Sequence, residues 1–312
     1  MKNISILISI LALAFFCSVQ ITSGQGTRLN VPGDYSTIQV AIRKANKGDT
    51  VLVSDGTYYE NIKIYSKSII LASHFILDGD EDHIRNTILD GSDPELADSA
   101  SVIMIRNCTG SGPLIKGFTI TGGKGTKLQP PGFAVMRLGG GIFVLLSAAT
   151  IENNIIRQNT VTNLADDACG GGIWAGNMST DRHVVIRNNT INDNHILSPF
   201  LPEGGGIMAG GEEGLILIEN NDISDNSATC TGYFKAMGGG IGAGTMEPWA
   251  TTIIIRNNRI ANNAAYCEAS FGGGIYISFP PGGDYDTWGG RAPIEIYNNL
   301  IVDNYSEDKA GG

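Results

Sequence analysis

Two short phrases recur along the sequence, and together they constrain the fold more than any other feature. The first phrase is Gly-Gly-Gly-Ile, which occurs five times, at Gly139, Gly170, Gly204, Gly238 and Gly272. The second phrase is an apolar residue followed by x-Asn-Asn-x-Ile-x-x-Asn, which begins at Ile151, Ile186, Ile218, Ile255 and Ile296. The Gly-Gly-Gly-Ile phrases begin 31, 34, 34 and 34 residues apart. Repeats at a nearly regular spacing of this size indicate stacked structural units that share one continuous core.

The residue types within each phrase indicate strands joined by sharp corners. Isoleucine alternates with other residues at period two, which is the pattern of a short strand with one face inward. Asn and Gly accept the left-handed backbone conformation that tight corners require. Three other repeat folds fit the sequence less well. Helical repeats would need an apolar period of 3.6 residues, and a hexapeptide β-helix would repeat near 18 residues. The nonapeptide of G-G-x-G-x-D type, which marks calcium-binding β-helices, is absent. We therefore predict an all-β protein, a right-handed parallel β-helix (solenoid) over residues 49–312.

The N-terminal residues predict a cleaved leader and a cap. Lys2 precedes an apolar run from Ile4 to Phe16, and small residues follow up to Gly24, as in a secretory signal peptide over residues 1–24; an uncleaved membrane anchor is the alternative. In the segment 25–48, the capping-box pattern Ser36–Gln39 predicts a short helix that covers the open end of the solenoid. No similar cap is expected at the C-terminal end of the solenoid. Because Gly311-Gly312 stands where a sixth Gly-Gly-Gly-Ile would begin, we expect the β-helix to be truncated there. The alternative is a short natural chain whose open end is closed by a partner.

Charge and cysteine content narrow the partners and the compartment. The formal net charge of −10 argues against nucleic acid and against anionic membranes as partners. We expect a secreted or cell-surface protein, with no membrane insertion after signal cleavage.

Export permits disulfides, and Cys230 and Cys267 each lie four residues after an equivalent corner Asn. Stacked coils lie about 4.8 Å apart, so we predict a disulfide between these two cysteines, and leave the pairing of Cys108 and Cys169 open.

Three segments resemble a known family. Val31-Pro-Gly-Asp-Tyr-Ser-Thr-Ile-Gln39, Gly48-Asp-Thr-Val-Leu-Val53 and Gly56-Thr-Tyr-Tyr-Glu-Asn-Ile62 resemble the start of secreted bacterial proteins of the pectin-lyase-like superfamily. The two repeated phrases are similar to the parallel β-helix repeats of that superfamily. The resemblance implies the fold and leaves the activity open, since the superfamily includes lyases, glycoside hydrolases, esterases and adhesins. No catalytic motif carries over residue by residue.

The position after the first Ile of the Asn phrase forms a column of charges on the outside of the solenoid. It reads Lys116, Glu152, Arg187, Glu219, Arg256 and Tyr297. In a lyase, Arg187 or Arg256 would remove the proton next to a uronate carboxylate. Alternating charges on adjacent strands also stabilise a sheet by about 0.2–1 kcal/mol per pair. The regular alternation favours the structural interpretation.

A second column falls at a corner of each coil. It reads Gln158, Asp193, Asp225, Asn262 and Asp303, and Asp222 lies nearby. Asp193, Asp222 and Asp225 are weak candidates for the acid and base of a glycoside hydrolase. Asp193 and Asp225 are also weak candidates for a Ca²⁺ site, and no other cofactor is expected. The alternative is that Asp and Asn stand here because they suit turns.

A third column follows Gly-Gly-Gly-Ile and carries aromatic side chains. It reads Phe143, Trp174, Met208, Gly242 and Tyr276, and the segment from Tyr276 to Pro293 adds Asp284, Asp286 and Trp288. We predict glycan contacts for Phe143, Trp174, Tyr276, Asp284, Asp286 and Trp288, because loops on one side of a solenoid often form its binding face. The alternative is that these aromatic residues are buried as a second core.

The sequence thus predicts an exported β-helix protein that binds extracellular polysaccharide along one side. Two alternatives stay open: a polysaccharide lyase or glycoside hydrolase, and a structural or adhesive spacer of a longer surface protein. An enzyme needs acid, base and charge-stabilising groups that converge on one face, whereas a spacer needs no accessible aromatic side.

Overall fold

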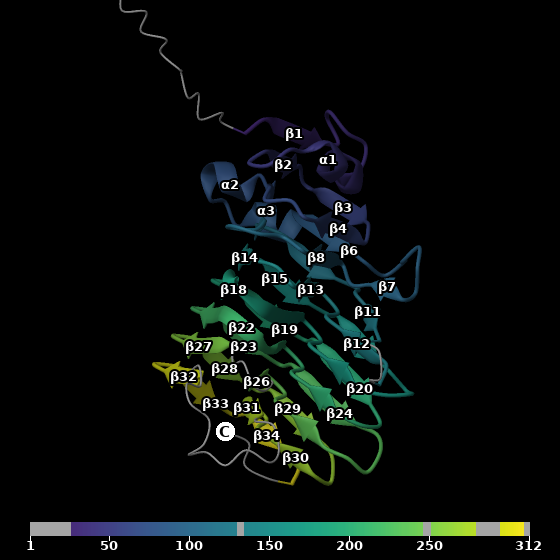
Figure 1. Cartoon of the computed structure of the whole chain (residues 1–312), viewed down its shortest axis with the longest axis vertical. Coiled ribbons are helices and arrows are strands. Elements are labelled where there is room, and N and C mark those ends of the chain that lie inside the picture. The colour runs from purple at the N-terminus through teal and green to yellow at the C-terminus, as the bar shows by residue number, and fades with distance from the viewer. Residues whose placement is uncertain (1–25, 130–133, 246–250, 279–293, 309–312) are drawn as a thin grey trace, which may run out of the picture.

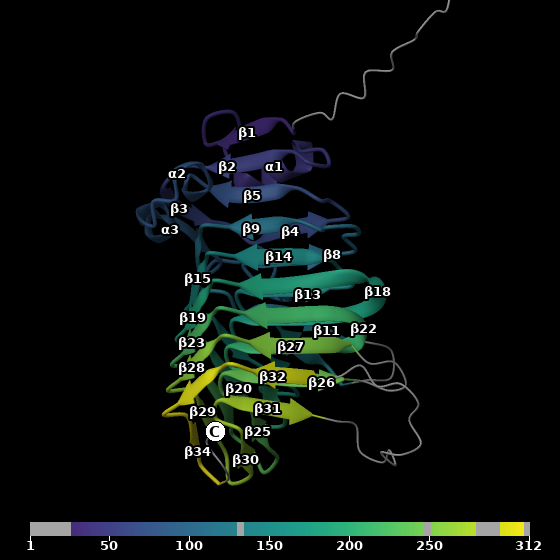
Figure 2. The ribbon, with the colours of Figure 1, turned by 90° about the vertical axis from the view of Figure 1, so that its left-hand side faces the viewer.

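The computed structural model describes residues 26–129, 134–245, 251–278 and 294–308. The described chain winds in successive coils along one axis, with helix α1 (Ile38–Lys44) near the N-terminal end (Figures 1 and 2). Each coil adds one short strand to each of several sheets, and nearly all neighbouring strands are parallel. The antiparallel exceptions are the pairs that β11 makes with β12 and with β7. The predicted all-β parallel β-helix is confirmed.

The strands of the described residues fall into four sheets. Sheet A contains β1 (Arg28–Val31), β2 (Thr50–Val53), β4 (Ile62–Tyr65), β5 (Ile70–Ser73), β8 (Ile103–Arg106), β9 (Leu114–Lys116), β13 (Ile142–Leu145), β14 (Ala149–Glu152), β18 (Ile173–Arg187), β22 (Ile207–Glu219), β26 (Ile241–Thr245), β27 (Thr252–Arg256), β31 (Ile275–Ser278) and β32 (Ile294–Tyr297). Sheet B contains β3 (Gly56–Tyr59), β6 (Thr87–Asp90), β10 (Thr119–Thr121), β15 (Ile155–Arg157), β19 (Thr190–Asn192), β23 (Asp222–Ser224), β28 (Arg259–Ala261) and β33 (Leu300–Val302). Sheet C contains β7 (Ser99–Ala100), β11 (Gly125–Leu128), β12 (Met136–Leu138), β17 (Ala168–Cys169), β21 (Pro202–Glu203), β25 (Ala236–Met237) and β30 (Ser270–Phe271). Sheet D contains β16 (Thr160–Thr162), β20 (His195–Ser198), β24 (Ser227–Cys230), β29 (Ala264–Tyr266) and β34 (Tyr305–Ser306).

The registers place equivalent residues of the repeat directly above one another. The isoleucine of each Gly-Gly-Gly-Ile phrase pairs with the isoleucine of the next coil, for example Ile173 with Ile207 and Ile207 with Ile241. These side chains belong to one apolar core that runs along the axis of the solenoid. The residue after each isoleucine therefore points outward, because side chains alternate along a strand.

The asparagines of the second phrase build two buried ladders. The side-chain amide of one Asn donates to the side-chain oxygen of the equivalent Asn in the next coil, as from Asn189 to Asn221 at 3.0 Å and from Asn194 to Asn226 at 2.9 Å. The first ladder contains Asn154, Asn189, Asn221, Asn258 and Asn299, and the second contains Asn159, Asn194, Asn226, Asn263 and Asn304. The ladders satisfy buried corner groups that would otherwise destabilise the coils.

Helix α1 covers the N-terminal end of the core, and its cap differs from the prediction. Ile38, Ala41 and Ile42 are buried. The N-cap is Thr37, whose hydroxyl accepts from the Val40 amide at 3.2 Å, whereas the sequence pattern suggested Ser36. The capping-box side chain, Gln39, instead pairs with the backbone of β4, and two further short helices, α2 (Phe75–Asp78) and α3 (Asp82–Asn86), follow β5.

At the other end, the inward side chains of the last described coil are open to solvent. Ile296 and Ile301 are 42% and 38% exposed, whereas their equivalents in the preceding coil, Ile255 and Ile260, are fully buried. Among the described residues, no helix is long and apolar enough to cross a membrane.

The predicted disulfide between Cys230 and Cys267 is wrong. Both cysteines are free and buried, although they occupy matching positions in adjacent coils as expected. Each sulfur faces backbone carbonyls. Cys230 Sγ lies 3.6 Å from the oxygens of Pro199 and Phe200, and Cys267 Sγ lies 3.3 Å from that of Phe234. Matching positions bring two cysteines into range, but bond formation also depends on the direction of each side chain.

Candidate functional site

The charged column on the outside of sheet A is a set of ion pairs. Lys116 Nζ lies 2.8 Å from Glu152, and Arg187 approaches the same carboxylate at 2.6 Å. In the next part of the column, Arg256 lies 2.7 Å from Glu219. Arg187, one of the candidate catalytic residues, is therefore held by Glu152.

The carboxylate of Glu152 forms ion pairs with two cations of this column. Burial of this side chain acts to raise its pKa, but the hydrogen bonds and charges of Lys116 and Arg187 outweigh burial and lower the pKa of Glu152 below its usual value. A buried carboxylate that stays ionised between two cations fixes the register of three coils.

The corner column adopts the left-handed backbone that the turn interpretation requires. Asp193 and Asp225 have φ of 54° and 58°, and Asp222 lies on β23 with its carboxylate 2.8 Å from Arg259. In the described part of the chain, no group of three or more His, Cys, Asp or Glu side chains is arranged to hold a metal ion.

Asp193 belongs to a polar row on the outside of sheet D. His195 Nε2 lies 2.9 Å from Asp193, and His195 Nδ1 lies 2.8 Å from the Ser227 hydroxyl. This arrangement has the residue types of a hydrolytic triad. However, the amide of Ser227 donates to the carbonyl of Asn194 at 2.9 Å, so it is not available to stabilise an oxyanion.

The aromatic column faces a second column that comes from sheet C. The column of sheet A contains Lys63, Met104, Phe143, Trp174, Met208, Gly242 and Tyr276, in strands β4 to β31. The column of sheet C contains Leu138, Cys169, Glu203, Met237 and Phe271, in strands β12 to β30. We call the line along which these two columns meet the seam. It lies outside the axial core, because Phe143, Leu138 and Cys169 pack in an apolar cluster of their own.

The predicted glycan contacts of the aromatic column divide between buried and half-buried residues. Phe143 is fully buried, and its ring stacks on that of Trp174 with centroids 5.1 Å apart. Phe143 therefore serves the second core, as the alternative interpretation expected. Trp174 and Tyr276 are half-buried, and the Tyr276 ring lies 6.1 Å from that of Phe271 across the seam. Asp284, Asp286 and Trp288 lie outside the described residues.

The sequence analysis missed Glu203, which stands in the middle of the sheet C column. Every other described member of this column that precedes a Gly-Gly-Gly is apolar or a cysteine. Burial, together with the charge of Asp167, raises the pKa of the Glu203 carboxyl to about 7. Comparison of the residues that precede each Gly-Gly-Gly would have singled out this carboxyl from the sequence.

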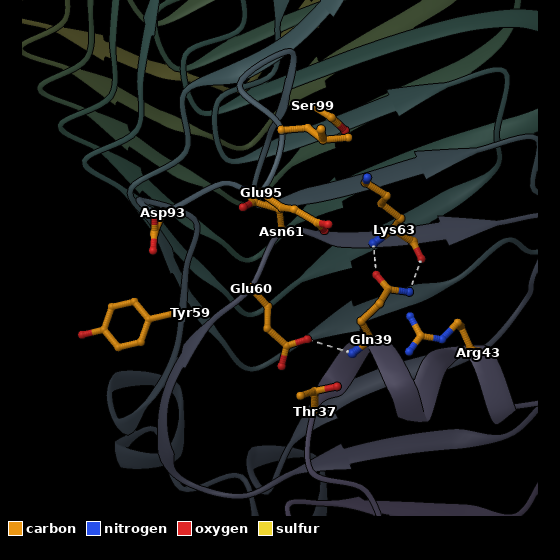
Figure 3. Close-up of a pocket in the computed structure, with 11 residues that line it drawn as sticks. Thr37, Gln39, Arg43, Tyr59, Glu60, Asn61, Lys63, Asp93, Glu95 and Ser99 are labelled. Atoms are coloured by element: carbon orange, nitrogen blue, oxygen red, sulfur yellow. Dashed lines mark hydrogen bonds between the residues drawn. The ribbon is translucent and has the colours of Figure 1, made fainter.

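A polar cavity lies at the N-terminal end of the seam (Figure 3). Two adjoining cavities of about 290 and 360 Å³ share Gln39, Arg43, Asn61, Lys63 and Glu95 as lining residues. The cavity touches both sides of the seam, since its lining includes Lys63 of β4 and Ser99 of β7. We call this site the polar cavity.

Some groups of the polar cavity are committed to the fold. The two carboxylate oxygens of Glu60 accept from the Ile38 and Gln39 amides at 2.9 Å each, so they complete the start of helix α1. The Gln39 side chain bonds to both the amide and the carbonyl of Lys63. These contacts hold helix α1 against β4, and both elements contribute lining residues to the cavity.

Other groups of the polar cavity are available to a ligand. Within the described residues, the side chains of Arg43, Lys63 and Glu95 have no hydrogen-bond or ion-pair partner. Tyr59 is 67% exposed at the edge of the cavity. Donors, acceptors and an exposed ring around one hollow suit a ligand that carries several hydroxyl groups.

Comparisons with known proteins agree with this architecture. The family described as "Right handed beta helix region" matches residues 18–311. The chain belongs to the right-handed β-helix family. Assignment to this family confirms the predicted handedness of the β-helix.

Three solved structures are similar to this right-handed β-helix protein at low identity. YbhC of Escherichia coli has 11% identity and a TM-score of 0.43, with 98% of this chain and 88% of that chain covered. A pectin methylesterase from carrot has 12% identity and a TM-score of 0.40, with 93% and 86% covered. A pectin methylesterase from Aspergillus niger has 12% identity and a TM-score of 0.38, with 92% and 90% covered. No curated protein matches the chain.

Proposed function

We propose that this protein binds an extended polysaccharide along the seam, with one part of the glycan in the polar cavity and another on the half-buried residues further along. The observation that supports the proposal most is the polar cavity, in which Arg43, Lys63 and Glu95 have no side-chain partner within the described part of the chain. Sugar hydroxyls both donate and accept hydrogen bonds, so they match side chains of both signs.

The second contact region is the part of the seam that carries Trp174, Met208 and Tyr276. These side chains are half-buried and present apolar surface. Trp174 and Met208 pack against the second core, and the Tyr276 ring lies against that of Phe271. The register places Met208 four strands from Lys63, which corresponds to about 19 Å along the axis. A ligand that reaches both regions must therefore be a chain of several sugars.

Between the two regions the seam is closed. Met104 and Phe143 are buried, and Leu128 and Met136 of strands β11 and β12 pack against their cluster. The glycan would pass over these strands and would contact the protein mainly at the two ends. Binding at two linked sites makes affinity rise with chain length.

We propose that the protein acts outside the cell, secreted or at the cell surface, where extended polysaccharides are found. This location agrees with the signal-peptide pattern of Lys2 and the apolar run up to Phe16. Protein recovered from the culture medium should begin near Gly24 or Gly26 by mass spectrometry. Intact Met1 on protein retained inside the cell would contradict export.

The test is a titration of oligosaccharides of increasing length against the wild type and two variants. The panel contains β-1,4-glucans, β-1,4-xylans, β-1,4-mannans and α-1,4-galacturonans. Tyr59→Ala removes the exposed ring of the polar cavity, and Trp174→Ala removes the ring in the second region. We expect each variant to lose about tenfold in affinity for the longest bound oligosaccharide, equivalent to about 1.4 kcal/mol.

A matched control comes from a tyrosine elsewhere on the surface. Tyr233 is 95% exposed and does not line the polar cavity, so Tyr233→Ala should bind as the wild type does. Circular dichroism of each variant separates lost binding from lost folding. A folded protein that binds no member of the panel would refute the proposal and favour the spacer alternative.

A further inference from the structure

We propose that Glu203 and Asp167 form the proton-donating and proton-accepting pair that hydrolyses a glycosidic bond of the glycan in the seam. This inference rests on the proposed function and adds a reaction to it. The two residues belong to adjacent coils of sheet C, Glu203 at the end of β21 and Asp167 immediately before β17.

The register brings the two carboxyls to one place. Cys169 and Glu203 are direct partners on neighbouring strands, and Asp167 lies two residues before Cys169. The Asp167 carboxylate accepts from the amide of Leu201 at 3.2 Å, so it reaches across to the strand that carries Glu203. An offset of one strand and two residues separates the Cα atoms by about 8 Å.

Residues two positions apart on a strand share a face, so both carboxyls lie on the same face of sheet C. Hydrolysis with inversion places a water molecule between two such carboxyls, as in glycoside hydrolases that hold them about 6.5–9.5 Å apart. The carboxyls of Glu203 and Asp167 are also close enough for the charge of one to affect the titration of the other.

Glu203 is a half-buried carboxyl without a partner among the described residues. In the described part of the chain, its side chain makes no hydrogen bond or ion pair. Buried polar groups are nearly always bonded, so an unpartnered carboxyl that faces a half-buried surface indicates a ligand. The surrounding side chains of the seam, Met208, Met237 and Tyr276, supply that surface.

Burial raises the pKa of both carboxyls. Burial, together with the charge of Asp167, raises the pKa of Glu203 to about 7, so much of this carboxyl keeps its proton at neutral pH. Burial and the charge of Asp166 raise the pKa of Asp167 as well. The other titratable neighbours are Cys169 and Tyr276, and burial raises the pKa of both and keeps them neutral.

The reaction consumes one water and leaves the carboxyls ready for another cycle after proton exchange. Glu203 gives its proton to the glycosidic oxygen while the bond from that oxygen to the anomeric carbon breaks. A water oxygen forms the new bond to the anomeric carbon, and Asp167 takes the proton of that water. The products are one chain with a free hydroxyl and one with a new reducing end. Glu203 is left ionised and Asp167 protonated, and solvent reverses both.

The experiment measures reducing ends released from the glycan panel by the wild type and three variants. We expect Glu203→Gln and Asp167→Asn to lower kcat by about 10²–10⁴-fold with little change in KM. The control Glu268→Gln replaces an exposed glutamate and should match the wild type. The wild-type rate should fall as the pH rises through about 7, because Glu203 then loses its proton.

A second measurement does not depend on turnover. The ¹³C signal of the Glu203 carboxyl should titrate near pH 7, and Asp167→Asn should shift that midpoint to lower pH because it removes a negative charge. Binding without release of reducing ends would overturn the reaction while it leaves the proposed binding intact. Unsaturated products that absorb at 235 nm, or full activity of Glu203→Gln, would overturn it as well.

Discussion

The asparagine ladder allows one stability prediction to be worked out in detail for Asn194→Ala. The side-chain oxygen of Asn194 accepts from the backbone amide and the side-chain amide of Asn159, at 3.2 and 2.9 Å. Its own side-chain amide donates to the oxygens of Ile156, Asn192 and Asn226, at 2.9, 3.1 and 2.9 Å. Asn194 is fully buried, so water does not replace these bonds without entering the core.

The expected loss follows from these contacts. A hydrogen bond contributes about 1 kcal/mol net, so five bonds sum to about 5 kcal/mol. The side-chain amide of Asn194 has two hydrogens for three acceptors, so this sum is an upper value. We expect Asn194→Ala to lower the free energy of unfolding by about 3–5 kcal/mol, mainly because the backbone amide of Asn159 is left buried without an acceptor.

The last rung of the same ladder is the matched control. Asn304 is half-buried, and its side chain makes three hydrogen bonds, two from Asn263 and one to Ile260. Water can replace part of these, so Asn304→Ala should cost about 1–2 kcal/mol. Urea denaturation followed by circular dichroism and by tryptophan fluorescence measures both variants. Equal losses for the two substitutions would refute the argument that burial of the ladder determines its contribution.

Three further predictions concern other parts of the molecule. Glu219→Lys would place a lysine against Arg256, so the melting temperature should fall and added salt should restore part of it; an unchanged melting temperature would contradict the ion-pair interpretation. The pKa of Glu203 is raised in the folded state, so the folded protein holds this proton more tightly than the unfolded chain does. The free energy of unfolding of the wild type should therefore decrease as the pH rises from about 4.5 to 7. The urea midpoint of Glu203→Gln should lack this decrease. Alkylation of denatured, unreduced protein should label both Cys230 and Cys267, and an unlabelled pair would contradict the free thiols.

The sequence by itself determined the fold and much of the outer surface. A side chain on a strand points in or out by position alone, so the repeated Ile and Asn positions predict which residues stack in each column. The ladder from Lys116 to Arg256 follows from that rule, and the structure confirms its ion pairs between Lys116, Glu152 and Arg187 and between Glu219 and Arg256. The left-handed corners at Asp193 and Asp225 follow in the same way.

Contacts between different sheets were decided only by the tertiary structure. The repeat shows that Phe143 and Trp174 point out of the coil, but it does not show that sheet C faces them and buries Phe143. Likewise, matching positions placed Cys230 beside Cys267, whereas the direction of each thiol follows from local packing against backbone carbonyls.

The two parts of the candidate site illustrate the same limit. The polar cavity joins helix α1 to residues around β4 and β7, segments that belong to no repeat and whose closeness no periodicity predicts. Glu203 is visible in the sequence as the charged residue before a Gly-Gly-Gly, but its proton affinity depends on burial and on Asp167 in the adjacent coil. Periodic sequence determines the order of residues within a column, whereas the environment between columns arises from side chains that only the folded chain brings together.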